Sequence, residues 1–568
     1  MVKIDRVSRI CQYFICLLIP IATFFRGGFF PVEYISIAIL LLLLTALIKE
    51  IKIPVIGALL VSGITIIYYI SALFGEYDAA LAVSECTKPV ILLLAVLIGV
   101  NIEKKDFFWS LVSAALLIAF VGILSLSKII EITDFVYIYN GTRQLQSTMQ
   151  YANSAAAVLI VGIFSARMLS LNGERRFILS CIEVFLTVCL LFTYSRIAIT
   201  IYILLTLLEL ALLNNGTSVS VLTKAIAGTA IFCIMLFFMN QRLSFAALIV
   251  CIVLTPILCE SIIKIKPASI KIKRVFLVPV AILALVVFSL FIKYADISTL
   301  MVRLLYYKDG INALLRNPIL GLSPSGWGEY QFEYQTAQYF VKYVHNGILQ
   351  AGLDAGILAM LLFATALLLP ITGLIKKWVG QKDANDLYIL LILTFLVAHG
   401  FFDFDFSFAN ILIILGICSA HGYQRYYITH MRSLRTVVCS LLIAFFLYLN
   451  YTEILLLSVP NRYKDGDLKN SKYLTEMLNI ANNNNDFTTY LQYQNLLFEM
   501  APMQQKTYSE AIRYLDKFYT EGVLTDRVHL EEKNRVISHA VTANNKMSSL
   551  NKYLDFGREI DIEISNMK

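Results

Sequence analysis

The sequence predicts an all-α membrane protein whose helices form a polytopic bundle. Of its 568 residues, 58% are hydrophobic and only 15% are charged, and the mean hydropathy is +0.72. A soluble domain cannot bury so much apolar surface, whereas a polytopic helical protein can expose it to lipid. A closed β-barrel would need alternating polar and apolar residues, and runs such as Ile37–Leu44 do not alternate. These observations together predict membrane-spanning helices.

The apolar runs are long enough, or nearly so, to cross a bilayer as helices that rise about 1.5 Å per residue. The first run is expected to be a retained anchor, because further spans follow it instead of a cleavage site and a soluble domain. The expected spans cover residues 10–25, 33–48, 53–74, 82–100, 107–126, 151–169, 177–193, 197–213, 223–239, 243–260, 274–293, 345–372, 386–402, 407–422 and 436–457.

The basic residues between these runs predict the orientation of the chain. If the spans alternate, all the basic loops fall on one side, and the positive-inside rule makes that side the cytoplasm. The opposite loops include Gly75–Asp78 and Phe402–Phe406, which carry acidic residues. The N-terminus is therefore expected inside and the C-terminus outside, and the net charge of +8 reflects orientation instead of nucleic-acid binding. The basic groups are Lys3 with Arg6 and Arg9, Lys49 with Lys52, Lys104 with Lys105, Arg175 with Arg176, Lys264 to Arg274, Lys376 with Lys377, and Arg425 to Arg435.

Residues 1–459 form the expected transmembrane domain, and two of its outer segments are long. They cover about residues 127–150 and 294–344, and the second ends at His345 and Asn346, the start of the next span. A loop of this length is usually functional or disordered. The second segment is rich in Tyr, Phe and Trp and poor in charge, which argues against disorder. It is therefore expected to be functional.

Residues 460–568 are polar and predict a small helical domain in the outer compartment. Apolar residues recur there at helical spacing, and Asn482–Asp486 and Gly522 mark breaks between helices. A stack of helix pairs of the tetratricopeptide type is one form that this domain could take, although no clear repeat signature is present.

Seven cationic or titratable residues fall on the expected outer face, where the positive-inside rule disfavours Lys and Arg. Arginine binds phosphate oxygens in pairs, aromatic faces suit sugar rings, and histidine can accept a proton from a hydroxyl. Together these groups favour glycosyl transfer from a diphosphate-linked donor. The seven residues are Arg143, Arg196, Arg242, Arg303, Arg316, Lys342 and His345.

Structural explanations stand beside each of these assignments. Arg196, at the tip of a hairpin between two spans, could be an interfacial anchor, and His345 could cap a helix. The aromatic residues of 327–343 could form an interfacial belt. Asp403 and Asp405 could be solvated loop residues, His399 a packed polar group, and Gly321, Gly326 and Gly328 turn formers. The ten cysteines lack CxxC or metal-ligand spacing, so neither disulfides nor a metal site is expected.

Three segments, in the expected order over residues 150–357, resemble the signature of the O-antigen ligase and polymerase superfamily. They are Tyr151-Ala152-Asn153-Ser154-Ala155, Thr193-Tyr194-Ser195-Arg196, and Arg303…Asn312…Asn317-Pro318-Ile319-Leu320-Gly321…Gly326…His345-Asn346-Gly347-Ile348-Leu349-Gln350…Gly352…Gly356. The resembling core extends over about residues 150–420.

The resemblance implies a membrane-embedded, GT-C-like glycosyltransferase that needs no metal or cofactor and inverts the anomeric carbon. It implies that Arg196 and Arg303 hold the diphosphate of an undecaprenyl-diphosphate-linked glycan and that His345 is the base. Arg143, Asn153, Trp327 and Asn346 are further candidate substrate contacts. The sequence departs from the family pattern at Tyr306 and Tyr307, where Trp is common, and in a stretched glycine turn.

The expected function is that of an O-antigen ligase-like enzyme in the bacterial cytoplasmic membrane. It would move a polysaccharide from undecaprenyl diphosphate to a hydroxyl of a lipid, teichoic, glycan or protein acceptor on the outer face. The outer helical domain favours a ligase over a polymerase of lipid-linked repeat units, since it could dock a bulky acceptor. A transporter of lipid-linked glycans is an alternative from another class, and it predicts internal repeats and ionisable residues near the bilayer midplane.

Overall fold

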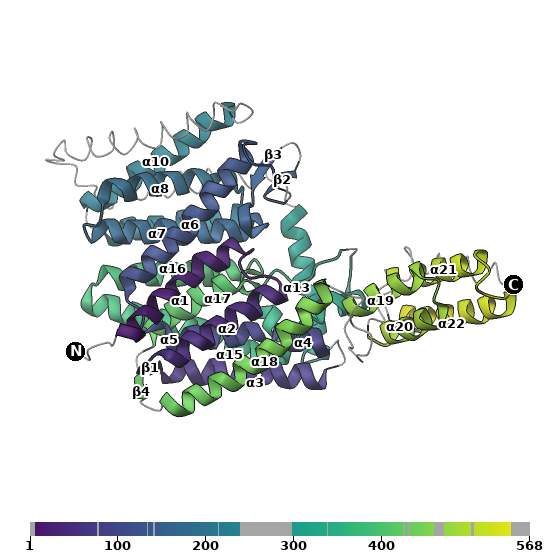
Figure 1. Cartoon of the computed structure of the whole chain (residues 1–568). Coiled ribbons are helices and arrows are strands. Elements are labelled where there is room, and N and C mark those ends of the chain that lie inside the picture. The colour runs from purple at the N-terminus through teal and green to yellow at the C-terminus, as the bar shows by residue number, and fades with distance from the viewer. Residues whose placement is uncertain are drawn as a thin grey trace. The chain divides into compact units, whose positions relative to one another are not determined.

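The structure is a computed structural model that describes residues 6–75, 79–132, 134–139, 142–213, 215–238, 298–337, 339–423, 426–429, 432–458, 471–500 and 505–546. Most of these residues are helical (Figure 1), which confirms the all-α expectation. The chain divides into two compact units. Unit 1 comprises residues 1–61, 90–297 and 365–444, and unit 2 comprises residues 62–89, 298–364 and 445–568.

Unit 1 consists mainly of helices, with two short antiparallel strand pairs, β1 with β4 and β2 with β3. Its elements are α1 (Arg6–Phe24), α2 (Pro31–Leu47), β1 (Ile51–Pro54), α6 (Lys104–Leu126), β2 (Val136–Tyr139), β3 (Thr142–Leu145), α7 (Ala152–Leu171), α8 (Arg176–Phe192), α9 (Arg196–Leu212), α10 (Asn215–Phe238), α16 (Ala384–Gly400), α17 (Ala409–Gly422) and β4 (Tyr426–Thr429).

Unit 2 contains α4 (Ala79–Glu85), α13 (Ser298–Arg316), α14 (Trp327–Tyr334) and the C-terminal helices α19 (Ser471–Asn483), α20 (Phe487–Met500), α21 (Gln505–Thr520) and α22 (Asp526–Lys546). Four helices contribute residues to both units, namely α3 (Val55–Phe74), α5 (Thr87–Gly99), α15 (Gly347–Gln381) and α18 (Arg432–Ser458).

Among the described residues, seven helices are long and apolar enough to cross a membrane, and four shorter apolar helices accompany them. These helices indicate a multi-pass membrane protein, as the sequence predicts. The expected spans at 243–260 and 274–293 lie outside the described residues. The span expected at 82–100 is divided between α4 and α5 by a turn at Cys86, and each of the others falls mainly on one described helix. The span expected at 345–372 is longer than predicted, because α15 continues to Gln381, and the backbone is non-helical at Ala355 and Gly356.

Loops that carry the basic residues meet one another at one end of unit 1. Strand β1 pairs with β4, so the residues that follow α2 lie beside those that follow α17. Ion pairs join further loops of the same group. They are Arg9 with Glu103 at 2.7 Å, Lys104 with Asp386 at 2.7 Å, and Lys105 with Glu174 at 2.5 Å. The described basic loops that these contacts join therefore share one end of this unit, which the expected orientation requires, whereas the basic group Lys264 to Arg274 lies outside the described residues. That this end faces the cytoplasm stays a prediction.

The loops that alternate with the basic ones also contact each other. The Thr148 hydroxyl donates to the carbonyl of Thr23 at 2.8 Å, and the amide of Asn410 donates to the carbonyl of Gly27 at 3.1 Å. The phenol of Tyr151 donates to Asp403 at 2.9 Å. Segments far apart in the sequence thus gather at a second end of unit 1, where the sequence places the outer loops.

Small side chains allow α7 to lie close against α6. The first turns of α7 are rich in Ala, and nearly all of its residues are buried. A Cβ atom at Gly162 of α7 would collide with the Cβ of Ala115 on α6. Close approach through small residues is the usual way in which membrane helices associate, because lipid supplies no hydrophobic drive between them.

A buried network of opposite charges joins α7, α8, α9 and α10. Arg167 forms ion pairs with Glu183 at 2.7 Å and Glu209 at 2.5 Å, and Lys224 pairs with Glu183 at 2.6 Å. All four side chains are buried, and the phenol of Tyr388 on α16 donates to Glu209 at 2.5 Å. Two cations balance two carboxylates, so the network is neutral when all four are ionised. None of these four charged residues is among the predicted site residues.

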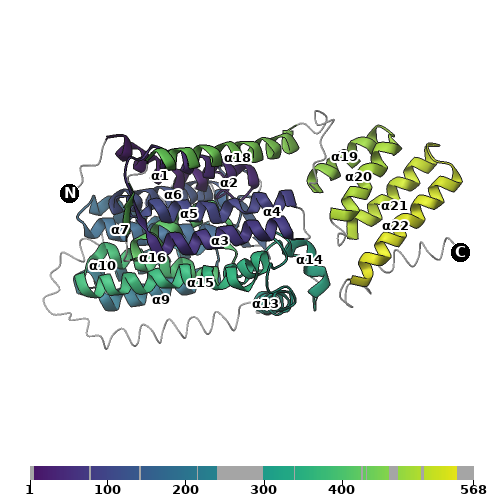
Figure 2. The ribbon, with the colours of Figure 1, turned by 90° about the horizontal axis from the view of Figure 1, so that it is seen from below.

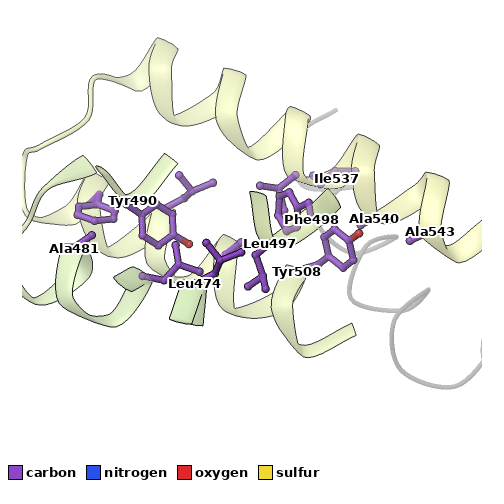
Figure 3. Packing of buried hydrophobic residues seen from close by; sticks show 14 of the residues in the cluster. Leu474, Ala481, Tyr490, Leu497, Phe498, Tyr508, Ile537, Ala540 and Ala543 are labelled. Atoms are coloured by element: carbon purple, nitrogen blue, oxygen red, sulfur yellow. The ribbon is translucent and has the colours of Figure 1, made fainter. Parts of the chain in front are cut away.

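The described C-terminal residues form two helix pairs, α19 with α20 and α21 with α22, around a shared aromatic core (Figure 3). Tyr490, Phe498, Tyr508 and Phe518 are buried there. The predicted helical character of this part is therefore present in the described helices. The expected domain boundary at 459–460 lies outside the described residues, and the tetratricopeptide form and the outer location stay predictions.

Candidate functional site

Two of the predicted site residues in unit 2, the diphosphate-binding candidate Arg303 and the catalytic candidate His345, are both neighbours of Tyr306. Arg303 is a buried residue of α13, and its charge acts on the phenol of Tyr306, three residues later on the same helix. The Tyr306 ring stacks on the imidazole of His345, with a centroid distance of 5.9 Å and an interplanar angle of 26°. Arg303 and His345 thus both have Tyr306 as a neighbour, although a helix, α14, separates their segments in sequence.

Asp309 fastens the loop that follows α14 onto α13. Its buried carboxylate accepts hydrogen bonds from the Thr336 amide at 3.0 Å, the Thr336 hydroxyl at 2.8 Å and the Tyr339 phenol at 2.7 Å. Burial raises the pKa of Tyr339, and the hydrogen bond to Asp309 raises this pKa further. Tyr339 therefore stays protonated at neutral pH and keeps donating to Asp309. Its ring also lies 4.4 Å from that of Tyr306.

The backbone of His345 is held in the left-handed region, with φ of +55°. A non-glycine residue rarely adopts this conformation unless its surroundings impose it. The Tyr307 hydroxyl donates to the His345 carbonyl at 2.8 Å, and the preceding amide, of Val344, donates to the side chain of Gln350 at 2.9 Å. Contacts on both sides of His345 thus fix the direction in which its imidazole leaves the chain.

Asn346 caps α15. Its side-chain oxygen accepts from the amides of Ile348 at 3.1 Å and Leu349 at 2.9 Å, which are otherwise unsatisfied donors of the first turn. The capping role considered for His345 therefore belongs to its neighbour. A role of Asn346 in substrate binding stays a prediction. Because the side-chain oxygen makes the cap, the side-chain amide nitrogen is the group that would contact the substrate.

Gln350 and Asp354 extend this support into α15. The Gln350 amide donates to Asp354 at 2.9 Å, and Asp354 also accepts from the Ser325 backbone amide and the Tyr68 phenol, each at 3.3 Å. Gln350 belongs to one of the motif segments of the sequence, whereas Asp354 is not among the predicted site residues. A carboxylate inside an apolar span is the signal that could have found it, because such residues are costly and usually functional.

Glycines allow the turn before α14 to lie against the break in α15. Gly321 has φ of +67°, and a Cβ there would collide with the backbone of Gly352 and Leu353. The amide of Leu322 donates to the carbonyl of Leu353 at 2.6 Å, and the amide of Ile357 donates to that of Pro318 at 2.9 Å. The turn therefore satisfies backbone groups that the break leaves open, in agreement with the turn-forming role considered for Gly321.

Trp327 lies in the core of this part of unit 2. Its side chain is fully buried and packs with Val344, Leu349 and Leu353, together with other apolar residues. Its indole N–H has no acceptor among the described residues. Because neither ring face is exposed, this conformation supports packing of the loop on α15 and not direct stacking on a sugar. Contact with substrate stays a prediction for this residue.

In unit 1, a hydrogen-bond network holds the turn that precedes Arg196. The Ser195 hydroxyl donates to the side-chain oxygen of Asn153 at 2.7 Å, and the Asn153 amide donates to Asp403 at 2.6 Å and to Tyr151 at 2.9 Å. Asn153 thus uses both ends of its amide to position other groups. Two of the three motif segments, at Asn153 and Ser195, meet in this network.

Arg196 is the first residue of α9, and its side chain is exposed. The partial positive charge at a helix N-terminus disfavours a cation and favours an anion. An arginine at this position therefore has no stabilising interaction with the helix dipole. An anionic group bound there would benefit from both charges, as the prediction for Arg196 requires.

Asp403 and Asp405 are fully buried, so the suggestion of solvated loop residues is wrong for both. The loop folds back onto α7, where Ser154 donates to Asp405 at 2.7 Å and Asn153 and Tyr151 donate to Asp403. His399 is also fully buried and contacts Asp405 through Nδ1. Hydrogen bonds from the start of α7 replace water around these carboxylates.

Arg143 lies on β3, where Nη2 donates to the carbonyl of Ser125 at 3.1 Å. Its Nε and Nη1 atoms are buried and have no hydrogen-bond partner among the described residues. Arg242, another of the arginines predicted on the outer face, lies outside the described residues.

The candidate residues are thus distributed over both units. Arg143, Asn153 and Arg196 belong to unit 1, and Arg303, Trp327, His345 and Asn346 belong to unit 2. The convergence of Arg196 with Arg303 and His345 stays a prediction. Within the described ranges, no group of three or more His, Cys, Asp or Glu residues could hold a metal ion.

Comparison of the chain with protein-family models finds no matching family, and comparison with curated proteins finds no match either.

Proposed function

We propose that the protein is an O-antigen ligase-like glycosyltransferase that moves a polysaccharide from undecaprenyl diphosphate to an acceptor hydroxyl at the outer face of the bacterial cytoplasmic membrane. The observation that supports this proposal most strongly is that Arg303 and His345 both have Tyr306 as a neighbour. A buried guanidinium and an imidazole beside flat aromatic faces suit a sugar diphosphate and the hydroxyl that attacks it.

In the proposed reaction, the imidazole of His345 takes the proton of the acceptor hydroxyl. The acceptor oxygen forms a bond to the anomeric carbon while the bond from that carbon to the diphosphate oxygen breaks, which inverts the carbon. The diphosphate leaves on its lipid, and Arg303 and Arg196 neutralise the charge that develops on it. Fixed cations of this kind often contribute the largest part of a rate enhancement.

Rigid support of the base favours this assignment. His345 is anchored through Tyr307 and Gln350, and the loop behind it is fastened by Asp309. A general base must lie within hydrogen-bond reach of its proton, so a side chain on a mobile turn would be a poor base. The Asn153–Ser195 network gives the turn before Arg196 comparable support.

Removal of the charged groups tests the proposal. His345→Ala and Arg303→Ala are each expected to lower transfer by at least about 10²-fold in purified protein supplied with lipid-linked glycan and acceptor, since losing one transition-state donor typically costs about 10²- to 10³-fold. Lys376→Ala is the matched control, because it removes an exposed charge near the opposite end of α15. Full activity in either site variant would remove that residue from the mechanism.

The products distinguish a ligase from a polymerase. In cells that lack the gene, full-length glycan left on its lipid carrier indicates a ligase, whereas single repeat units at the surface indicate a polymerase. The C-terminal helices support the ligase, because a separate helical region could dock a bulky acceptor.

One observation favours the transporter alternative. Arg167, Glu183, Glu209 and Lys224 are buried ionisable residues within helices α7 to α10, and such residues often line transport pathways. Each of these charges already has an opposite partner, which is also what a structural network requires. Movement of a labelled lipid-linked glycan across proteoliposomes without an acceptor would support the transporter, and its absence alongside glycan transfer would support the enzyme.

A further inference from the structure

Helix α13 exposes several apolar side chains and buries two charged ones, whereas a helix at the surface of a soluble domain buries its apolar face. Met301, Leu304, Ile311 and Leu315 are between 49% and 66% exposed. Arg303 and Asp309, on the same helix, are buried. We call the four exposed residues the α13 apolar stripe.

The spacing of the stripe shows that it occupies one face. Successive members are three, seven and four residues apart, and each of these steps returns to nearly the same side of a helix with about 3.6 residues per turn. Lys308 is exposed within this face, four residues after Leu304 and three before Ile311, and Arg316 is exposed beside it. α13 therefore has a basic amphipathic surface, which is typical of helices that lie in a membrane interface.

The opposite face of α13 packs on the first turns of α15, one of the seven candidate membrane spans. A Cβ atom on Gly310 would come within 3.1 Å of Val344 and within 3.4 Å of Leu349 and Leu353. A Cβ atom on Gly352 would come within 2.9 Å of Leu314. α13 is thus fixed at the level where a membrane span begins.

The axis of α13 is oriented as expected for a helix that lies in the plane of the membrane. Figures 1 and 2 show α13 running crosswise to α3 and α15, and in Figure 2 it is seen nearly along its own axis. α15 has exposed apolar residues of its own, such as Leu358 and Leu361, farther along the span. A helix across the end of a lipid-exposed span lies where headgroups and acyl chains meet.

We propose that α13 is an interfacial helix whose apolar stripe is inserted among the lipid chains of the bilayer surface at which α15 begins. Lys308 and Arg316 would extend from the stripe to lipid phosphates, since long basic side chains can place their charge at the headgroups while their stems stay in apolar surroundings. The bilayer would then cover the outer face of the helix, and the inner face would present Arg303 and Asp309 to the rest of unit 2. This inference does not depend on the proposed enzymatic activity.

The test is the environment of each stripe residue in the full-length protein in a lipid bilayer. A nitroxide linked to an introduced keto amino acid at position 304, 311 or 315 avoids the native cysteines. Collision rates with oxygen, which concentrates in lipid, and with a water-soluble nickel chelate are then measured by electron paramagnetic resonance. Frequent oxygen collisions and few nickel collisions are expected at all three positions.

Two positions in the same chain calibrate the measurement. Leu361, an exposed apolar residue within α15, is the lipid reference, and Arg527, an 87% exposed side chain of α22, is the water reference. The depth obtained from the collision ratio should be smaller at the stripe than at Leu361. Frequent nickel collisions at the stripe would show that it faces water. Few collisions with either reagent would show that protein covers it, either residues 239–297 or a second copy of the chain. Either result would overturn the proposal.

Discussion

His345 adopts a left-handed backbone conformation that its neighbours must maintain, so its catalytic use depends on residues that do not touch substrate. Gln350 is the main support on the C-terminal side, because it accepts from the Val344 amide and donates to Asp354. If the proposed function holds, Gln350 is a positioning residue. Its loss would leave the imidazole present but less well oriented.

Gln350→Ala is accordingly expected to lower kcat about five- to tenfold with little change in KM, since one hydrogen bond is worth about 1 kcal/mol. Steady-state kinetics of glycan transfer measure both constants. The double exchange Gln350→Glu with Asp354→Asn restores a donor–acceptor pair and should recover most of the rate. Gln381→Ala, at the exposed end of the same helix, is the control. An increase in KM alone would contradict a positioning role.

As the residue that caps α15, Asn346 could contribute both to folding and to substrate binding, and two substitutions distinguish these contributions. Asn346→Ala removes the cap of α15 and is expected to lower the free energy of unfolding by about 0.5–2 kcal/mol, measured by thermal or denaturant unfolding in detergent. Asn346→Asp keeps an oxygen acceptor for the same amides and should retain stability. If the aspartate variant is stable but does not transfer glycan, the side-chain amide contacts substrate.

The helices themselves could be predicted from the sequence, because a bilayer sets both the length and the apolar character of a span. The side chains that pair with one another across these helices could not be predicted. Arg167 is balanced by Glu183 and Glu209 on two other helices, and only the folded chain brings these groups together. Asp403 illustrates the same limit, since its donors lie on the distant segment at Tyr151 and Asn153. The capping role of Asn346, by contrast, follows from local preference and could have been recognised.

For the whole molecule, the clustering of basic loops at one end of unit 1 leads to a prediction about orientation. The positive-inside rule places that end in the cytoplasm and the C-terminus outside. Fused at the C-terminus, alkaline phosphatase is therefore expected to be active and green fluorescent protein to be dark. The same reporters fused after Gln381 should give the opposite result, because the end of α15 there carries Lys376 and Lys377 of the basic group. Fluorescence at the C-terminus would refute the predicted topology.

The pairing of charges among α7 to α10 also bears on how the chain enters the bilayer during synthesis. One charged residue at the centre of a helix raises the cost of insertion by about 2.5–3.5 kcal/mol. Arg167 and Glu183 lie on consecutive helices, so the α7–α8 hairpin can leave the translocon as a neutral unit. Glu209 and Lys224 supply one charge of each sign on the next hairpin, and their ion pairs with the first hairpin can form afterwards. Biogenesis can therefore proceed two helices at a time without leaving net charge in lipid.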